Sequence, residues 1–144
     1  MRQTEQKLWD RFRENTKRHY KGLPLREKPN YQRIENLVDT GRPDVDWLIK
    51  GVFSCVELKA VENAPVRATT RVFGPDGLSV AQRNWHMSWE QAGGKSFVLA
   101  SVGKDHFLIE GVLHDYFNDM TLGQLHEAAV AFTWPQIFRA LELA

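Results

Sequence analysis

The stretch RPDVDWLIKGVFSCVELKA, residues 42–60, decides the fold because it places charged side chains in a segment that is otherwise apolar. Its apolar residues predict two strands, about 44–49 and 52–60, joined by a two-residue turn at Lys50 and Gly51. Glycine supplies the positive φ that such turns need. Three carboxylates and an ammonium in these strands require a partner or a function, since such groups are rarely buried alone.

Pairing the two strands outward from the turn places Asp44 opposite Glu57. Asp46 then faces Cys55. Because side chains alternate along a strand, one face of the hairpin is apolar and comprises Val45, Trp47, Ile49, Val52, Val56, Leu58 and Ala60. The opposite face gathers the carboxylates at the open end of the hairpin, where opposed Cβ atoms lie about 4.5–5.5 Å apart.

Two carboxylates this close repel each other, and the pKa of one rises unless a cation lies between them. Mg²⁺ removes the conflict, because it takes one or two carboxylates, keeps several waters and accepts the phosphate oxygens of a substrate. Lys59 lies on the same face as Glu57 and can contact a phosphate or the attacking water. The pattern therefore predicts metal-assisted phosphodiester hydrolysis. The structural alternative is a buried ion pair of Lys59 with Glu57 or Asp44, which adds little net stability.

The rest of the chain alternates helical and extended patterns. The stripe Leu8, Trp9 and Phe12 predicts a helix over 3–20 with Thr4 as its N-cap. Ser79 opens a second helix, over 79–94. The remaining predicted elements are strands at 31–38, 96–102 and 105–112, a long loop at 61–77, and helices at 121–132 and 133–143 that open with capping boxes.

This order predicts an α/β fold in which a mixed sheet is flanked by helices. At 144 residues, the chain suits a single domain. We expect a basic N-terminal helix and linker at 1–28, a catalytic core at 31–110 and a helical C-terminal extension at 111–144.

Positive charge is concentrated at the start of the chain, although the formal net charge is only +1. Residues 1–28 carry nine Lys or Arg against four Asp or Glu, and the remainder carries ten against fourteen. Such a basic arm suits a polyanionic partner such as nucleic acid, or it is a solvated helix face.

Several function classes find no support in the sequence. The lone Cys55 is interpreted as a small core residue in a reducing setting, which favours the cytoplasm of a bacterium or a phage-infected host. No apolar stretch predicts a membrane segment. No glycine-rich loop predicts a nucleotide cofactor, and the histidines lack zinc-site spacing. His86 is expected to be partly exposed on its helix.

The PD at 43–44 and the ELK at 57–59 resemble the signature of the PD-(D/E)xK nuclease superfamily. Two further features resemble the VRR nuclease-type and Holliday-junction-resolvase-like branch. One is the glycine ahead of the motif, Gly41, and the other is the run at 78–102 from a glutamine-bearing helix through glycine into a strand. The resemblance covers residues 31–102 well, the first helix loosely and 111–144 hardly at all. It implies a restriction-endonuclease-like fold and an Mg²⁺-dependent deoxyribonuclease in which Mn²⁺ can substitute.

The same resemblance implies roles for individual residues. Asp44 and Glu57 would be metal ligands, with the backbone carbonyl of Leu58 as another. Lys59 would position or polarise the attacking water. Gln82 would lie near the scissile phosphate.

Two of these assignments leave alternatives. Gln82 also fits a capping box with Ser79. A glutamate on the first helix usually touches the site in this family. Glu5, one turn before the buried stripe, is preferred over Glu14 and Glu35.

The expected substrate is DNA, branched or duplex, bound with little sequence specificity. The preferred function is a structure-selective endonuclease, such as a Holliday-junction resolvase of phage type. It would act as a homodimer because two cuts need two sites. The alternatives are a nonspecific or single-strand-directed nuclease, and a non-cleaving nucleic-acid-binding module. The expected phosphate contacts are Arg11, Arg13, Lys17, Arg18, Arg67, Arg71 and Arg83, and the aromatic candidates for a dimer surface are Trp85, Trp89, Phe132, Trp134 and Phe138.

Overall fold

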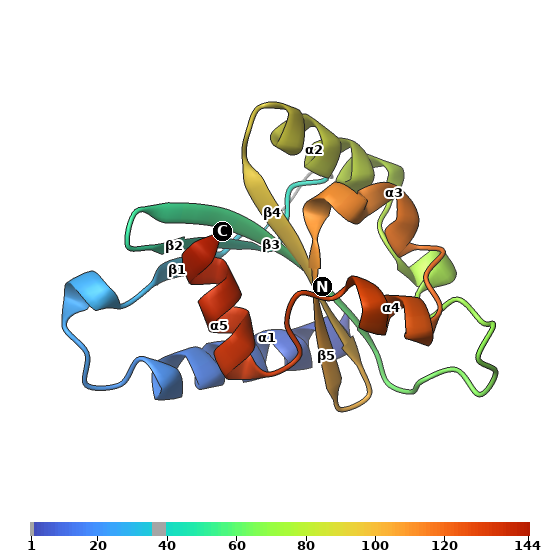
Figure 1. Ribbon diagram of the computed structural model, residues 1–144, viewed down its shortest axis with the longest axis horizontal. Helices are drawn as coiled ribbons and strands as arrows, with labels where there is room; N and C mark the ends of the chain where they lie inside the picture. Colours follow the sequence, from blue (N-terminus) through green and yellow to red (C-terminus); the bar gives the residue numbers. More distant parts are fainter. Residues whose placement is uncertain (1, 36–39) are drawn as a thin grey trace.

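The computed structural model describes residues 2–35 and 40–144, and it shows one sheet with helices on both faces (Figure 1). The sheet is mixed, since β3 and β4 run parallel while the other neighbouring pairs are antiparallel. This confirms the predicted α/β class. In spatial order, the strands are β1 (Asn30–Arg33), β2 (Val45–Ile49), β3 (Val52–Val61), β4 (Lys95–Val102) and β5 (Asp105–Glu110).

Helices connect and cover these strands. None of the described helices is long and apolar enough to cross a bilayer. The α-helices are α1 (Gln3–His19), α2 (Val80–Gln91), α3 (His114–Phe117), α4 (Leu122–Ala128) and α5 (Trp134–Leu143). Short 3-10 turns are η1 (Leu25–Glu27), η2 (Gly74–Asp76) and η3 (Gly111–Leu113).

The β2–β3 hairpin forms as the sequence predicts. Lys50 and Gly51 both adopt positive φ, 48° and 81°, which is the pattern of a type I′ turn. Asp46 pairs with Cys55 in the predicted register. The turn therefore fixes which side chains share a face, and it places Asp44 just before the first paired residue of β2.

Two apolar layers enclose the sheet. On one face, α1 and α5 pack against alternate residues of β2 and β3, with Trp47 stacked on Phe138 at the centre. On the other face, β4 and β5 pack against α3, α4 and the loop before α2. Glu57 and Lys59 point to this second face, because their neighbours Val56 and Leu58 belong to the first layer.

Several element boundaries differ from prediction; the strand expected at 105–112, for instance, ends at Glu110, where η3 begins. The strand expected at 31–38 ends at Arg33, and residues 36–38 lie outside the described residues. The helix expected at 121–132 ends at Ala128 because the chain beyond it pairs with β5, where Ala131 and Leu108 form a bridge. The loop expected at 61–77 begins one residue later, since Val61 ends β3, and it includes η2.

Two side-chain expectations are wrong. Thr4 is not the N-cap of α1, since that position is Arg2; the Thr4 hydroxyl instead donates to the Ala60 carbonyl at 3.3 Å. His86 is fully buried rather than partly exposed, because a ring nitrogen hydrogen-bonds the Ser96 hydroxyl at 2.8 Å. Burial lowers the pKa of His86 to about 4, so it is a neutral core residue.

Candidate active site

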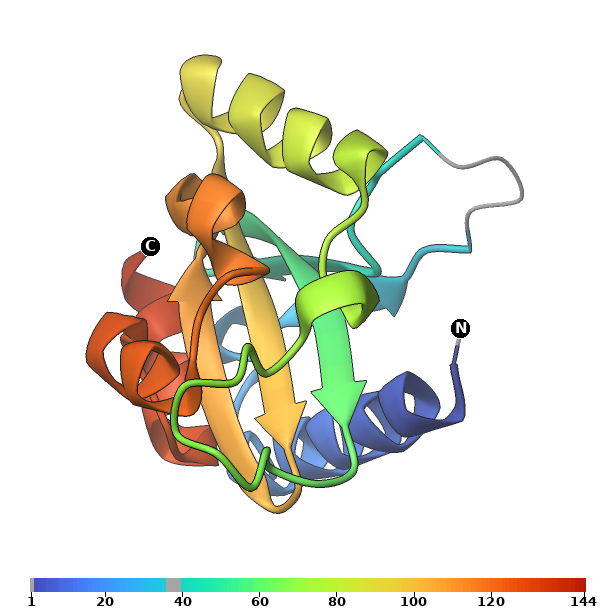
Figure 2. The ribbon, with the colours of Figure 1, turned by 90° about the vertical axis from the view of Figure 1, so that its right-hand side faces the viewer.

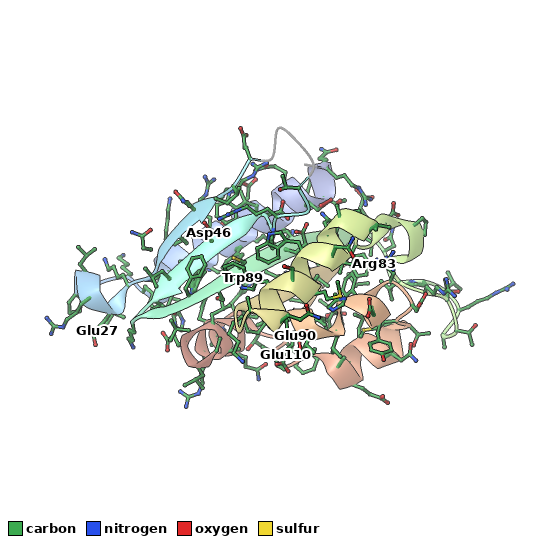
Figure 3. All side chains as sticks on the ribbon, turned by 90° about the horizontal axis from the view of Figure 1, so that it is seen from above. Glu27, Asp46, Arg83, Trp89, Glu90 and Glu110 are labelled. Atoms are coloured by element: carbon green, nitrogen blue, oxygen red, sulfur yellow. The ribbon has the colours of Figure 1, made fainter. Side chains whose placement is uncertain are left out.

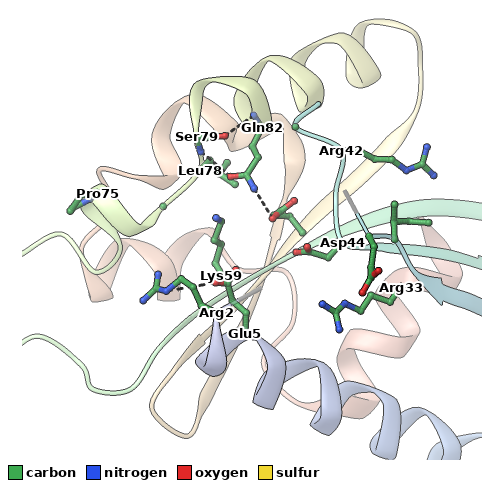
Figure 4. Close-up of a pocket in the computed structure, with 15 residues that line it drawn as sticks. Arg2, Glu5, Arg33, Arg42, Asp44, Lys59, Pro75, Leu78, Ser79 and Gln82 are labelled. Carbon is green, nitrogen blue, oxygen red and sulfur yellow. Dashed lines mark hydrogen bonds and ion pairs between the residues drawn. The ribbon is translucent and has the colours of Figure 1, made fainter. Parts of the chain in front are cut away.

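A cavity of about 940 Å³ is lined by residues at the N-terminus of α1, on the central strand β3 and at the N-terminal end of α2. These three elements can be followed in Figure 2. This volume is in the range of small-molecule and substrate sites. The fold brings to its wall the five side chains that the sequence predicts to be catalytic, namely Glu5, Asp44, Glu57, Lys59 and Gln82. All of these but Glu57 are labelled in Figure 4.

Glu57 and Asp44 both line this cavity, Glu57 buried and Asp44 half-buried. Glu57 is 1% exposed, and its pKa is raised well above the usual value. Burial is the main cause and the negative charge of Asp44 is the second, while Lys59 acts in the opposite direction. Asp44 is fixed by the backbone of β3, because the Leu58 N–H donates to Asp44 Oδ2 at 2.9 Å. Glu57 Oε2 has no hydrogen-bond partner among the described residues.

Lys59 carries a buried charge without a direct partner. It is 8% exposed, and its ammonium group forms no ion pair or hydrogen bond with the residues that the structure describes. The ion pair with Glu57 or Asp44 that a purely structural role requires is therefore not formed. The Lys59 side chain extends from the Glu5 side of the cavity toward Gln82 (Figure 4).

Glu5 reaches the cavity from the first turn of α1. Its side chain is buried, which raises its pKa; Lys59 lowers that pKa and Asp44 raises it. Of the competing glutamates, Glu35 also lines the cavity. Glu14 does not, and it pairs with Arg18 at 3.2 Å on the exposed side of α1.

Gln82 forms the predicted capping box and also lines the cavity, while its place near a scissile phosphate stays a prediction. Its Oε1 accepts from the Ser79 backbone N–H at 2.9 Å, and the Ser79 hydroxyl accepts from the Gln82 N–H at 3.1 Å, which completes a capping box. Its Nε2 meanwhile donates to Glu57 Oε1 at 3.0 Å. The cap of α2 therefore holds a carboxyl of the cavity in place.

Asp46 is engaged elsewhere. Arg42 Nη2 donates to its two carboxylate oxygens at 2.8 and 2.6 Å, and the Cys55 thiol lies 3.7 Å from Oδ1. Cys55 is buried, and burial, with Asp46 as the second cause, raises its pKa to about 12. This confirms Cys55 as a small core residue.

The side chains at Asp44 and Glu57 fit a hard divalent cation. No group of three or more His, Cys, Asp or Glu within residues 2–35 and 40–144 is placed to hold a metal. However, Mg²⁺ needs only one or two carboxylates and completes its shell with water. The buried, unpartnered Glu57 Oε2 beside a second carboxyl is the donor set that such an ion would satisfy. The backbone carbonyl of Leu58 points toward Asp44 as its N–H does, because the N–H and C=O of one strand residue point in the same direction.

The predicted phosphate contacts are dispersed over the surface, away from this cavity. Arg11 is turned toward β4, where it donates to the Ser101 hydroxyl at 3.0 Å. Arg71 pairs with Asp119 at 3.3 Å. None of the seven, Arg11, Arg13, Lys17, Arg18, Arg67, Arg71 or Arg83, lines the cavity.

Three arginines that the sequence reasoning missed do line it: Arg2, Arg33 and Arg42. Arg42 directly precedes the PD motif, and this was the available signal. Arg33 is brought there by its contact with α1, since it donates to Gln6 Oε1 at 2.8 Å.

The five aromatic candidates for a dimer surface separate into two groups. Phe138 is fully buried, and Trp134 stacks on it. Trp85 and Trp89 instead stack on each other along α2, with ring centroids 4.8 Å apart. Trp89 also packs against Phe53 of the β2–β3 hairpin (Figure 3). Phe132 is 39% exposed. The homodimer itself stays a prediction.

Comparisons with known proteins give structural likenesses alone. No family model matches the chain, and no curated protein matches it. Among solved structures, the chain is similar to Archaeoglobus fulgidus Hjc, a Holliday junction resolvase from an archaeal hyperthermophile. The TM-score is 0.46 with 11% identity, over 72% of this chain and 78% of that chain. Because a likeness this remote assigns no activity, we derive the function from the side chains of the cavity.

Proposed function

We propose that this protein is an Mg²⁺-dependent nuclease of PD-(D/E)xK type that hydrolyses phosphodiester bonds in DNA. The observation that carries the proposal is the buried Glu57 beside the half-buried Asp44 and a buried Lys59 without an ion-pair partner among the described residues, all in one open cavity. Strongly perturbed carboxyl groups in a cavity are typical of functional sites. Burying Glu57 and Lys59 destabilises the fold unless a ligand uses their charges.

Asp44, Glu57 and the Leu58 carbonyl would hold Mg²⁺, or Mn²⁺ in its place. When bound, such an ion lowers the pKa of water and stabilises negative charge on a phosphate. Gln82 would keep Glu57 oriented through its 3.0 Å hydrogen bond. The Lys59 ammonium, which has no competing partner among the described residues, would position the attacking water or donate to the phosphate.

The cavity wall favours a phosphate-bearing substrate. Arg2, Arg33 and Arg42 line it, and the N-terminal end of α2 opens into it at Ser79. Helix N-termini and arginines both favour phosphate groups. Backbone contacts of this kind carry no sequence information, so selectivity would follow the shape of the DNA. We therefore propose branched DNA, such as a four-way junction, as the preferred substrate of a homodimer.

The test is cleavage of a labelled four-way junction beside a matched linear duplex and a single strand, each with Mg²⁺, with Mn²⁺ and with EDTA. Metal-dependent cutting of the junction alone is the expected result, and sedimentation then checks the dimer. Cutting of all three substrates would leave a nonspecific nuclease. Binding without cutting under both metals would contradict the enzyme and leave a nucleic-acid-binding module.

Substituting Gln82 separates its two contacts. Gln82→Glu keeps a capping-box side chain but loses the Nε2–H that donates to Glu57, and it adds a third carboxylate. We expect cleavage to fall about tenfold or more, because a hydrogen bond to a charged group contributes about 1.5–3 kcal/mol. Ser79→Ala is the matched control, because it removes the cap, costs about 1 kcal/mol of stability and keeps the Gln82–Glu57 contact. Cleavage that falls equally in both variants would show that only the cap matters.

A further inference from the structure

A second cavity, of about 330 Å³, lies at the C-terminal end of α1, the end remote from the active-site cavity. Its wall carries three lysines, Lys17, Lys21 and Lys28, together with Tyr20 and Tyr31. Within the described residues, none of these lysines forms an ion pair. The wall thus presents uncompensated positive charge beside two aromatic rings.

Strand β1 connects this second cavity with the active site. Tyr31 lines the lysine cavity, and Arg33, two residues further on, lines the active-site cavity. Residues two apart in a strand share a face. That face is turned toward α1, since the Tyr31 ring packs against Trp9 with centroids 6.1 Å apart and Arg33 donates to Gln6. The two cavities therefore lie at opposite ends of one α1–β1 surface.

Between the two ends, the acidic side chains of α1 are paired with arginines, Asp10 with Arg13 and Glu14 with Arg18. Arg13 lies near Tyr31, because its charge lowers the pKa of that tyrosine against the stronger effect of burial. The carboxylate that borders this surface, Asp10, is already engaged at 3.5 Å by Arg13 and at 3.1 Å by Gln6. At the far end, Glu142 accepts a hydrogen bond from the Tyr20 hydroxyl at 2.8 Å. The nearby acids thus leave the three lysines available.

We propose that Arg33, Arg13, Lys17, Lys21 and Lys28 form a basic track that holds one strand of the DNA backbone as it leaves the active-site cavity. This assignment rests on the proposed function, which makes DNA the substrate. It adds the path that the DNA follows on the protein surface. From Gln6 to Lys17, α1 spans about 16 Å. One strand of B-form DNA presents about five phosphates over that length.

The experiment measures binding separately from cleavage. A fluorescein-labelled four-way junction is titrated in EDTA over a series of NaCl concentrations, with anisotropy as the readout. The track variant is K17Q/K21Q/K28Q. The matched control is K7Q/K104Q/R139Q, which removes the same charge at positions outside the track. All six substitutions leave the buried core untouched.

The track variant should bind about 10- to 100-fold more weakly, and its log Kd against log[salt] slope should fall by about 2 to 3, since each lost phosphate contact removes about 0.9. The control should change the slope by less than about 1. Equal slopes for the two triple variants, or no binding by the unmodified protein, would overturn the track. A separate Mg²⁺ assay decides the nuclease: a slope change without any cutting upholds the track as a binding surface and rejects the enzyme.

Discussion

Replacing Glu57 with glutamine should abolish metal-dependent cleavage while the fold becomes more stable. The charge stabilisation that a bound metal supplies amounts to several kcal/mol, so we expect at least about a 1000-fold loss of rate. Glutamine keeps the oxygen that accepts from Gln82 and offers an amide donor to Asp44, so no new orphan group is buried. Binding of the junction in EDTA should persist, which would distinguish a lost reaction from a lost fold.

The stability gain has a definite pH dependence in EDTA. Folding raises the pKa of Glu57, so its contribution to stability is fully present below its unfolded pKa of about 4.3 and is lost as pH rises toward the folded value. Glutamine does not titrate. The difference in unfolding midpoint between Glu57→Gln and the unmodified protein should therefore grow from pH 4 to pH 8.

Thermal unfolding at pH 4, 6 and 8 measures this difference, with Glu14→Gln as the control. Glu14 is exposed on α1, so its substitution should leave the stability unchanged within about 0.5 kcal/mol at every pH. If the gain in stability from Glu57→Gln is the same at all three pH values, the pKa of the Glu57 carboxyl is not raised by folding.

The β2–β3 hairpin and the three charged side chains at its open end could be predicted because the sequence signal for them is local. A Lys-Gly turn and strict alternation fix the faces of β2 and β3, and Asp44, Glu57 and Lys59 lie within sixteen residues of one another. The capping boxes at Ser79, Thr121 and Thr133 are local in the same sense, and all three form.

The remainder of the site depends on packing between distant segments. Nothing near Thr4 in the sequence indicates that its hydroxyl bonds Ala60 and so brings Glu5 into the same cavity as Lys59. Likewise, His86 is buried because Ser96 lies on the next strand. The sequence also presents the capping box and a place in the site as alternatives for Gln82. One side-chain amide has both an acceptor and a donor, so Gln82 accepts from Ser79 and donates to Glu57 at the same time.

Gly41→Ala should cost the most stability of any substitution outside the apolar layers. Gly41 has φ +76°, and a Cβ there would overlap the Ala81 carbonyl group and lie 2.8 Å from the Gln82 nitrogen. Both are backbone atoms in the first turn of α2, so the helix itself would have to move. Left-handed strain of about 1–2 kcal/mol and overpacking of about 1–3 kcal/mol together predict a loss of about 2–5 kcal/mol.

Gly51→Ala is the matched control for this crowding. Gly51 has φ +81°, nearly the same conformation, but a Cβ at this position would meet no other atom within 4 Å. It should therefore lose only the strain of about 1–2 kcal/mol and keep its cleavage rate. Gly41→Ala should also lose cleavage, because moving α2 separates Gln82 from Glu57. Equal losses in the free energy of unfolding for the two variants, measured by chemical denaturation, would contradict this account. The close approach of residue 41 to α2 would then not position the site, and Gly41 would be needed only for its positive φ.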